Sequence, residues 1–103
     1  MQMARHALLD RAVAMSRRMC ALGGEGEWSA VIDLEPQRRE LLEQAFATRE
    51  PVDDDLAAKV REIMELDKGL IHLSEQAREE IAGDLSRASR GKRVTRAYHS
   101  AAR

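Results

Sequence analysis

The sequence predicts an all-α fold: a small antiparallel bundle of three main helices, the third of them long, followed by a short C-terminal helix. Apolar residues recur at intervals of three and four along most of the chain, which is the spacing of one helix face. No segment alternates apolar and polar residues as a half-buried strand does. Only two prolines interrupt the chain. We therefore expect residues 1–103 to form a single helical domain.

The first helix is expected from about Met3 to Leu22. Its apolar residues are spaced four, three, four and three apart, as in a heptad seam. They are Leu8, Ala12, Met15, Met19 and Leu22. Gly23 and Gly24 follow directly, and glycine tolerates the left-handed conformation that closes many helices. We expect this glycine pair to end the helix.

The second helix is expected from about Glu27 to Thr48, with Trp28 at its start. One face carries its apolar residues, namely Val31, Leu34, Leu41 and Ala45. Pro36 lies in the middle and has no N–H to donate to the carbonyl of Ile32. The helix either kinks there or breaks and restarts with Pro36 in its first turn. We favour a kinked, near-continuous helix, because the apolar stripe keeps its phase across the proline.

The segment from Arg49 to Asp55 is expected as a loop, because Pro51 disfavours helix at the residue before it. Asp53 and Asp54 are N-cap candidates for the helix that follows. This third helix should span roughly 35 residues, or about 50 Å, at ~1.5 Å per residue. Its apolar face runs through Leu56, Val60, Ile63, Leu70, Leu73, Ala77, Ile81, Leu85 and Ala88, and Asp67 interrupts it.

The last part of the chain is basic. After Asp84 there are six Lys and Arg residues and no acidic residue, so this end of the chain carries a charge of +6. Because the net charge of the whole chain is −1, the residues up to Asp84 together carry −7. Gly91 is expected to end or hinge the third helix, and Val94, Ala97 and Tyr98 suggest a short fourth helix. Its weak apolar face predicts that residues 90–103 are a mobile or conditionally docked segment.

Three interpretations of this basic segment are open. It is a solvated helix end whose cations offset the helix dipole, a contact for nucleic acid, or a regulatory segment that folds onto the acidic body. Nucleic acid is the least favoured of these, because the segment has no aromatic platform.

No motif points to catalysis. The three histidines are far apart and lack metal-ligand spacing with carboxylates or with Cys20. The chain has no Gly-rich phosphate loop, HExxH motif or nucleophile elbow. We therefore expect no enzyme activity, no metal and no cofactor. A single cysteine, no signal-peptide core and no long apolar stretch together favour a cytoplasmic protein without a membrane span.

Two stretches resemble the flagellar export chaperone FliT family. They are GEWSAVIDLEPQRRELLEQ and REIMELDKGLIHLSEQAREEIAGDLSRASRGKRVTRAY. The matching elements are Gly26-Glu27-Trp28, Leu34-Glu35 with Arg38, Ile63 with Leu66-Asp67, and the segment from Gly91 to Tyr98. Each element is short, and it is their order, spacing and matching length that carry the resemblance.

The resemblance implies a cytoplasmic, all-helical chaperone of flagellar type III secretion. Such proteins bind the C-terminal segment of the filament cap protein, prevent its premature assembly and deliver it to the export ATPase complex. Some members also bind the flagellar master transcription activator. This work needs an amphipathic groove rather than a reactive centre. We assign one wall of that groove to Ile63, Leu66, Leu70, Leu73 and Ala77.

In this family the C-terminal helix covers part of the binding surface and acts as a gate. We accordingly assign a regulatory tail to Arg93, Val94, Arg96 and Tyr98. The competing hypothesis is a self-associating helical regulator whose basic tail contacts nucleic acid or a partner protein. A seam that continues beyond a three-helix core is also compatible with a homodimer.

Overall fold

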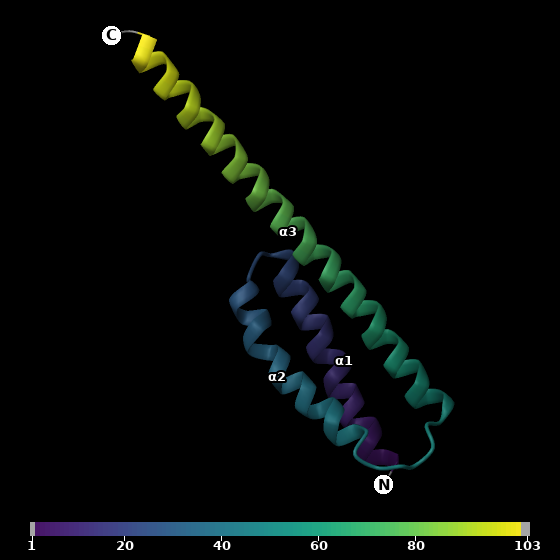
Figure 1. Cartoon of the computed structure of the whole chain (residues 1–103). Helices are drawn as coiled ribbons and strands as arrows, with labels where there is room; N and C mark the ends of the chain where they lie inside the picture. The colour runs from purple at the N-terminus through teal and green to yellow at the C-terminus, as the bar shows by residue number, and fades with distance from the viewer. Residues whose placement is uncertain (1, 102–103) are drawn as a thin grey trace. The chain divides into compact units, whose positions relative to one another are not determined.

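The structure, a computed structural model, describes the backbone of residues 2–101 and the side chains of residues 3–90. Within that range it contains three α-helices and no strand. They are α1 (Gln2–Gly24), α2 (Trp28–Ala45) and α3 (Asp54–Ala101), as labelled in Figure 1. The all-α prediction is therefore confirmed for the described residues.

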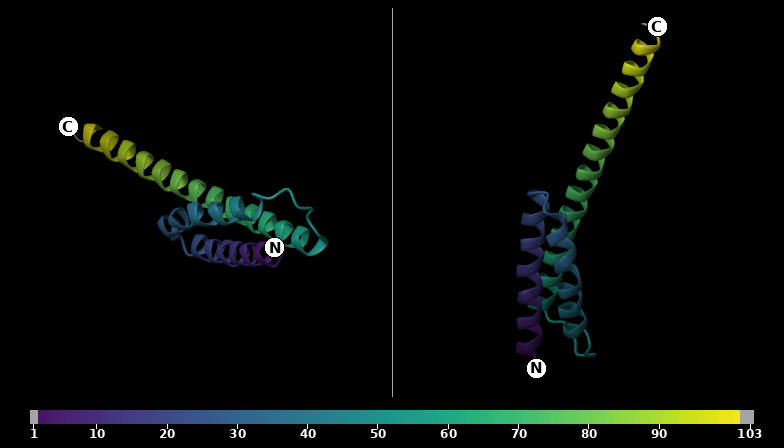
Figure 2. Two further views of the ribbon diagram at one scale, coloured as in Figure 1. Left: turned by 90° about the horizontal axis from the view of Figure 1, so that it is seen from below. Right: turned by 90° about the vertical axis from the view of Figure 1, so that its left-hand side faces the viewer.

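The chain divides into two compact units, residues 1–73 and residues 74–103. In the first unit, called the bundle below, α1 and α2 run antiparallel and the first part of α3 lies along them (Figures 1 and 2). The second unit, called the C-terminal segment below, is the remainder of α3. The single-domain organisation stays a prediction.

The end of α1 lies two residues beyond Leu22, and the glycine that closes it is Gly26. Gly26 has a φ of +76°, which is the left-handed region. The Glu27 N–H donates to the Leu22 carbonyl at 2.9 Å, and the Gly26 N–H donates to the Gly23 carbonyl at 3.1 Å. This pair of bonds is the Schellman motif. Gly23 and Gly24, which were expected to end α1, are its last two residues, but the left-handed conformation that closes the helix is at Gly26.

Helix α2 runs unbroken through Pro36, as the near-continuous alternative predicted. The side-chain amide of Gln37 donates to the Asp33 carbonyl at 3.2 Å, one turn back on the same helix. The helix ends at Ala45 rather than near Thr48.

Arg5 holds the connection between α2 and α3 against α1. Its side chain is buried, and its guanidinium donates to the Ala45 carbonyl at 2.9 Å and to the Glu50 and Pro51 carbonyls at 3.2 Å each. The guanidinium carbon also lies 5.8 Å from the centre of the Phe46 ring. The Ala45 carbonyl is one of the last four of α2, which have no partner within the helix, and Arg5 supplies one.

Asp53 caps α3, as predicted. Its Oδ1 accepts the Leu56 N–H at 2.7 Å, and its Oδ2 lies 3.2 Å from Nε2 of His6. Lys59, one turn further along α3, lies 2.8 Å from Asp10 and 2.9 Å from Nδ1 of His6. The first turn of α3 is therefore tied to α1 by polar contacts.

Helix α3 is longer than predicted, with 48 residues. It passes through Gly91 to Ala101, so the described backbone contains no separate fourth helix. A helical glycine costs only ~1 kcal/mol relative to alanine, too little to end a helix by itself. The side chains of Arg93, Val94, Arg96 and Tyr98 lie outside those that the structure describes.

The core of the bundle is built from the apolar faces of all three helices. Its buried members are Leu9, Ala12, Val13, Leu41, Ala45, Leu56 and Ile63, with Leu8, Met15, Leu42 and Val60 packed against them. These include residues from the predicted seams of each helix. Burial of such side chains, at ~25 cal/mol per Å² of apolar surface, is the main force that assembles the bundle.

The Asp53 cap predicts a pH-dependent contribution to stability. The Leu56 N–H, and then His6, lower the pKa of Asp53 from its ordinary value of 3.8. A lowered folded-state pKa stabilises the fold above the ordinary pKa, and that contribution is lost as pH falls through the lowered value. We expect the wild-type chain to melt above an Asp53→Ala variant at neutral pH, with the gap closing in acid. Thermal unfolding followed by circular dichroism checks this.

An Asp53→Asn variant is the control for this measurement. An amide also caps a helix but does not titrate. Its advantage over Asp53→Ala should persist at acidic pH. If the wild-type chain also kept its higher melting temperature over Asp53→Ala in acid, ionisation of the Asp53 carboxylate would not contribute to stability.

Candidate partner-binding surface

The residues predicted to line a groove have different positions in the structure. Ile63 is only 5% exposed and belongs to the bundle core. Leu66, Leu70 and Leu73 are partly exposed in the bundle part of α3. Ala77 is also partly exposed, but it belongs to the C-terminal segment. The three leucines are therefore the members of the predicted wall that the bundle itself presents at its surface.

Trp28 and Leu70 meet over Gly23. A Cβ at Gly23 would lie 3.1 Å from Cδ1 of Leu70 and 3.1 Å from Cη2 of Trp28. Gly23 is buried, whereas Trp28 and Leu70 are half-buried. The absence of a Cβ at Gly23 lets the Trp28 ring and the Leu70 side chain approach the α1 backbone closely.

A further apolar side chain of α2 is exposed near Trp28 in the sequence. Ile32 follows Trp28 by one helical turn, on the same face, and is 68% exposed. We define the apolar edge of the bundle by five residues. They are Trp28 and Ile32 of α2, and Leu66, Leu70 and Leu73 of α3. The sequence predicted the α3 half, whereas for Trp28 a packing role was favoured over that of an interface anchor.

A polar contact joins all three helices beside this edge. Arg38 of α2 donates to Asp67 of α3 and, at 3.2 Å, to the hydroxyl of Ser16 on α1. Ser16 is 1% exposed and donates in turn to the Ala12 carbonyl at 2.9 Å. Asp67, which interrupts the apolar face of α3 in the sequence, is therefore the partner of Arg38.

Cys20 is a further contact between α1 and α3. Its thiol donates to the Leu66 carbonyl at 3.1 Å. Burial, and then the negative charge of Asp67, raise the pKa of the Cys20 thiol above 9.0, while Arg38 opposes them. The thiol is therefore held in its protonated form, which is a poor nucleophile.

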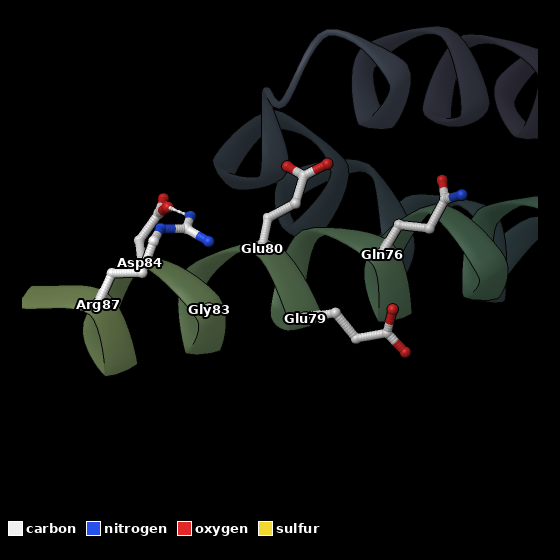
Figure 3. Close-up of a pocket in the computed structure, with 6 residues that line it drawn as sticks. All are labelled: Gln76, Glu79, Glu80, Gly83, Asp84 and Arg87. Carbon is white, nitrogen blue, oxygen red and sulfur yellow. Dashed lines mark hydrogen bonds and ion pairs between the residues drawn. The ribbon is translucent and has the colours of Figure 1, made fainter. Parts of the chain in front are cut away.

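Two hollows are lined by residues that do not belong to the apolar edge. One, of about 220 Å³, lies between α1 and α2, with Arg11, Met15, Gln37, Glu40, Leu41 and Gln44 around it. The other lies along α3 in the C-terminal segment, with Gln76, Glu79, Glu80, Gly83, Asp84 and Arg87 around it (Figure 3). Both are lined mainly by polar side chains. In the second, Arg87 forms an ion pair with Asp84 on its own helix.

The described side chains form no group of three His, Cys, Asp or Glu residues that could hold a metal ion. Nor is any helix within the described range both long and apolar enough to cross a membrane. The feature of this part of the chain best suited to binding a partner is its partly exposed apolar edge. The helices that carry this edge are joined by polar contacts.

Comparison with known families places most of the chain in one of them. Residues 6–100 match the family described as Flagellar protein FliT. No curated protein and no solved structure matches the chain.

The role of Gly23 predicts a large difference between two neighbouring glycines. A leucine at Gly23 would displace Trp28 and Leu70, and overpacking of this kind costs about 1–3 kcal/mol. A Cβ at Gly24 would meet nothing within 4 Å, and leucine has a higher helix propensity than glycine. We expect Gly23→Leu to lower the free energy of unfolding and shift Trp28 emission, and Gly24→Leu to do neither. Urea unfolding with fluorescence detection checks this, and equal effects would contradict the close approach at Gly23.

Proposed function

Because the chain belongs to the FliT family of flagellar export chaperones, we propose that it binds the C-terminal segment of the filament cap protein. It does so in the cytoplasm, before export. By covering an apolar helix of the cap protein, it prevents premature assembly and keeps the cargo competent for delivery to the export ATPase complex. The observation that carries this proposal is the apolar edge of the bundle.

The apolar edge fits recognition of an amphipathic helix. Such a helix places apolar anchors one turn apart into a hydrophobic surface on its partner. Leu66, Leu70 and Leu73 recur at the matching intervals of four and three along α3. Trp28 also belongs to this surface, and tryptophan is enriched at the hot spots of protein interfaces.

The edge is also organised before cargo arrives. Trp28 and Leu70 both lie close to the backbone at Gly23, and the Cys20 thiol donates to the Leu66 carbonyl. A surface whose side chains are already ordered loses less conformational entropy on binding. This supports a binding function rather than a purely structural one for the half-buried residues.

We assign regulation of this surface to the basic tail, in particular to Arg93, Val94, Arg96 and Tyr98. The residues after Asp84 carry six cations, whereas the rest of the chain is acidic. Opposite charge steers such a segment toward the acidic part of the chain. Its displacement would then expose the cargo surface to the cap protein.

Two further partners follow from the family rather than from a site described in the structure. Delivery requires contact with the export ATPase complex, and a modulating role in flagellar transcription requires contact with the master activator. The alternative function, a regulator whose basic tail contacts nucleic acid, predicts salt-sensitive retention on DNA.

Calorimetric titration with the cap protein's C-terminal segment tests the cargo proposal. We expect binding by the full chain, weakened about tenfold or more by a Leu70→Ala, Leu73→Ala double variant. Met64→Ala is the control, because Met64 is 56% exposed on the same helix but outside the apolar edge. Absence of binding by the full chain, and by a chain stopped at Leu85, would contradict the proposal.

The chain stopped at Leu85 separately tests the tail. Tighter cargo binding by this variant than by the full chain is expected if the tail restricts access. Equal binding would leave the cargo surface in place and remove the regulatory assignment of the tail.

A further inference from the structure

The apolar edge of the bundle ends at an acidic turn. Glu25 and Glu27 lie in the turn between α1 and α2, directly before Trp28, and both are exposed. The backbone N–H groups of both residues donate to the Leu22 carbonyl, at 3.1 and 2.9 Å. This hydrogen-bonded turn therefore holds two carboxylate-bearing residues next to Trp28, the first residue of the edge on α2.

Within the described part of the chain, neither carboxylate supports the fold through a bond of its own. Glu27 is the N-cap residue of α2, but its side chain makes no capping hydrogen bond. Among the described side chains, neither Glu25 nor Glu27 has an ion-pair partner. The last turn of α1 contains no basic residue either, although a helix C-terminus carries partial negative charge. Negative charge therefore gathers at this turn without a counter-charge from the described side chains.

Four ion pairs neutralise other charged side chains on α2 and α3, the helices that carry the edge. The pairs are Arg38 with Asp67, Arg39 with Glu35, Arg17 with Glu62, and Lys68 with Glu65. The Arg or Lys nearest to the turn in sequence is Arg18, which lies five residues before Gly23 and so on another side of α1. Residues 1–73 contain 14 Asp and Glu residues and 10 Lys and Arg residues. The surplus charge at this end of the edge is thus negative.

We propose that the helix bound at the apolar edge is basic at one end. Its apolar anchors pack on Leu66, Leu70 and Leu73, and the Lys or Arg side chains that flank those anchors pair with Glu25 and Glu27. This inference rests on the proposed cargo function. It names the chemistry of the cargo helix, which is a run of apolar anchors flanked by cations.

The acidic turn then selects among helices that share the same apolar anchors. Opposite charge on the partner speeds association, whereas like charge costs binding free energy. An acidic helix would bring its carboxylates against Glu25 and Glu27 and bind less tightly. Because both glutamates are exposed, they act at the rim of the surface, and salt screens their attraction for a cation.

Calorimetric titration of the full chain with the cap protein's C-terminal segment, at two salt concentrations, tests this inference. The double variant Glu25→Gln, Glu27→Gln removes both charges and keeps the size of both side chains. We expect it to bind about three- to tenfold more weakly than the wild type at low salt, and the two affinities to converge at high salt. The matched control is Glu40→Gln, Glu43→Gln, because both residues are exposed on α2 outside the edge. The control should bind as the wild type does.

An exchange of charge between the two partners tests direct contact. The chain carries Glu25→Lys and Glu27→Lys, and the cap segment carries Glu in place of the Lys or Arg residues that flank its apolar anchors. Each of these changes alone should weaken binding, and the two together should restore the affinity to near the wild-type value. Damage to folding cannot produce such a recovery, so recovery reports pairing across the interface.

Three results would overturn this inference alone. They are a glutamine double variant that binds the cap segment as tightly as the wild type at low salt, a charge exchange without recovery, and a bound cap segment that has no Lys or Arg beside its anchors. In each case the full chain still binds its cargo, so the proposed function stands. Absence of binding by the wild-type full chain, and by the chain stopped at Leu85, would overturn both proposals.

Discussion

The ion pair between Arg38 and Asp67 is the contact on which the geometry of the bundle depends. Arg38 is 12% exposed in its side chain, so its charge needs acceptors, and it finds a carboxylate on α3 and the Ser16 hydroxyl on α1. Helices packed by apolar side chains alone slide and rotate at small cost. A half-buried guanidinium with two fixed acceptors on two other helices permits one register only.

That register determines where the apolar edge of the bundle lies. Asp67 lies next to Leu66, whose carbonyl accepts the Cys20 thiol, and one turn from Leu70, which rests on Gly23. At the other end of the bundle, Arg5 and Asp53 fix the connection that leads into α3. Polar contacts thus set the positions of the helices, while the apolar core provides most of the stability.

Local sequence signals predicted the helices, much of the core and the Asp53 cap, because each depends on residues a few positions apart. Local signals do not predict contacts between residues that are far apart in the sequence. Arg5 reaches carbonyls 40 to 46 residues away, and nothing near it in the sequence indicates this. Asp67 was interpreted as an interruption of a seam, although the resemblance contained both it and Arg38. Gly23 was assigned to a turn, whereas its lack of a Cβ serves the packing of Trp28 and Leu70.

A double-mutant cycle on Arg38→Gln and Asp67→Asn tests this account most directly. The free energy of unfolding would be measured in urea for the four chains, with a second cycle on the exposed Arg39–Glu35 pair for comparison. The account predicts that each single change is costly and that the second adds little to the first, giving a coupling of about 1–3 kcal/mol. The exposed pair should couple far more weakly. Additive effects at Arg38 and Asp67 would show that the pair does not hold the helices in register.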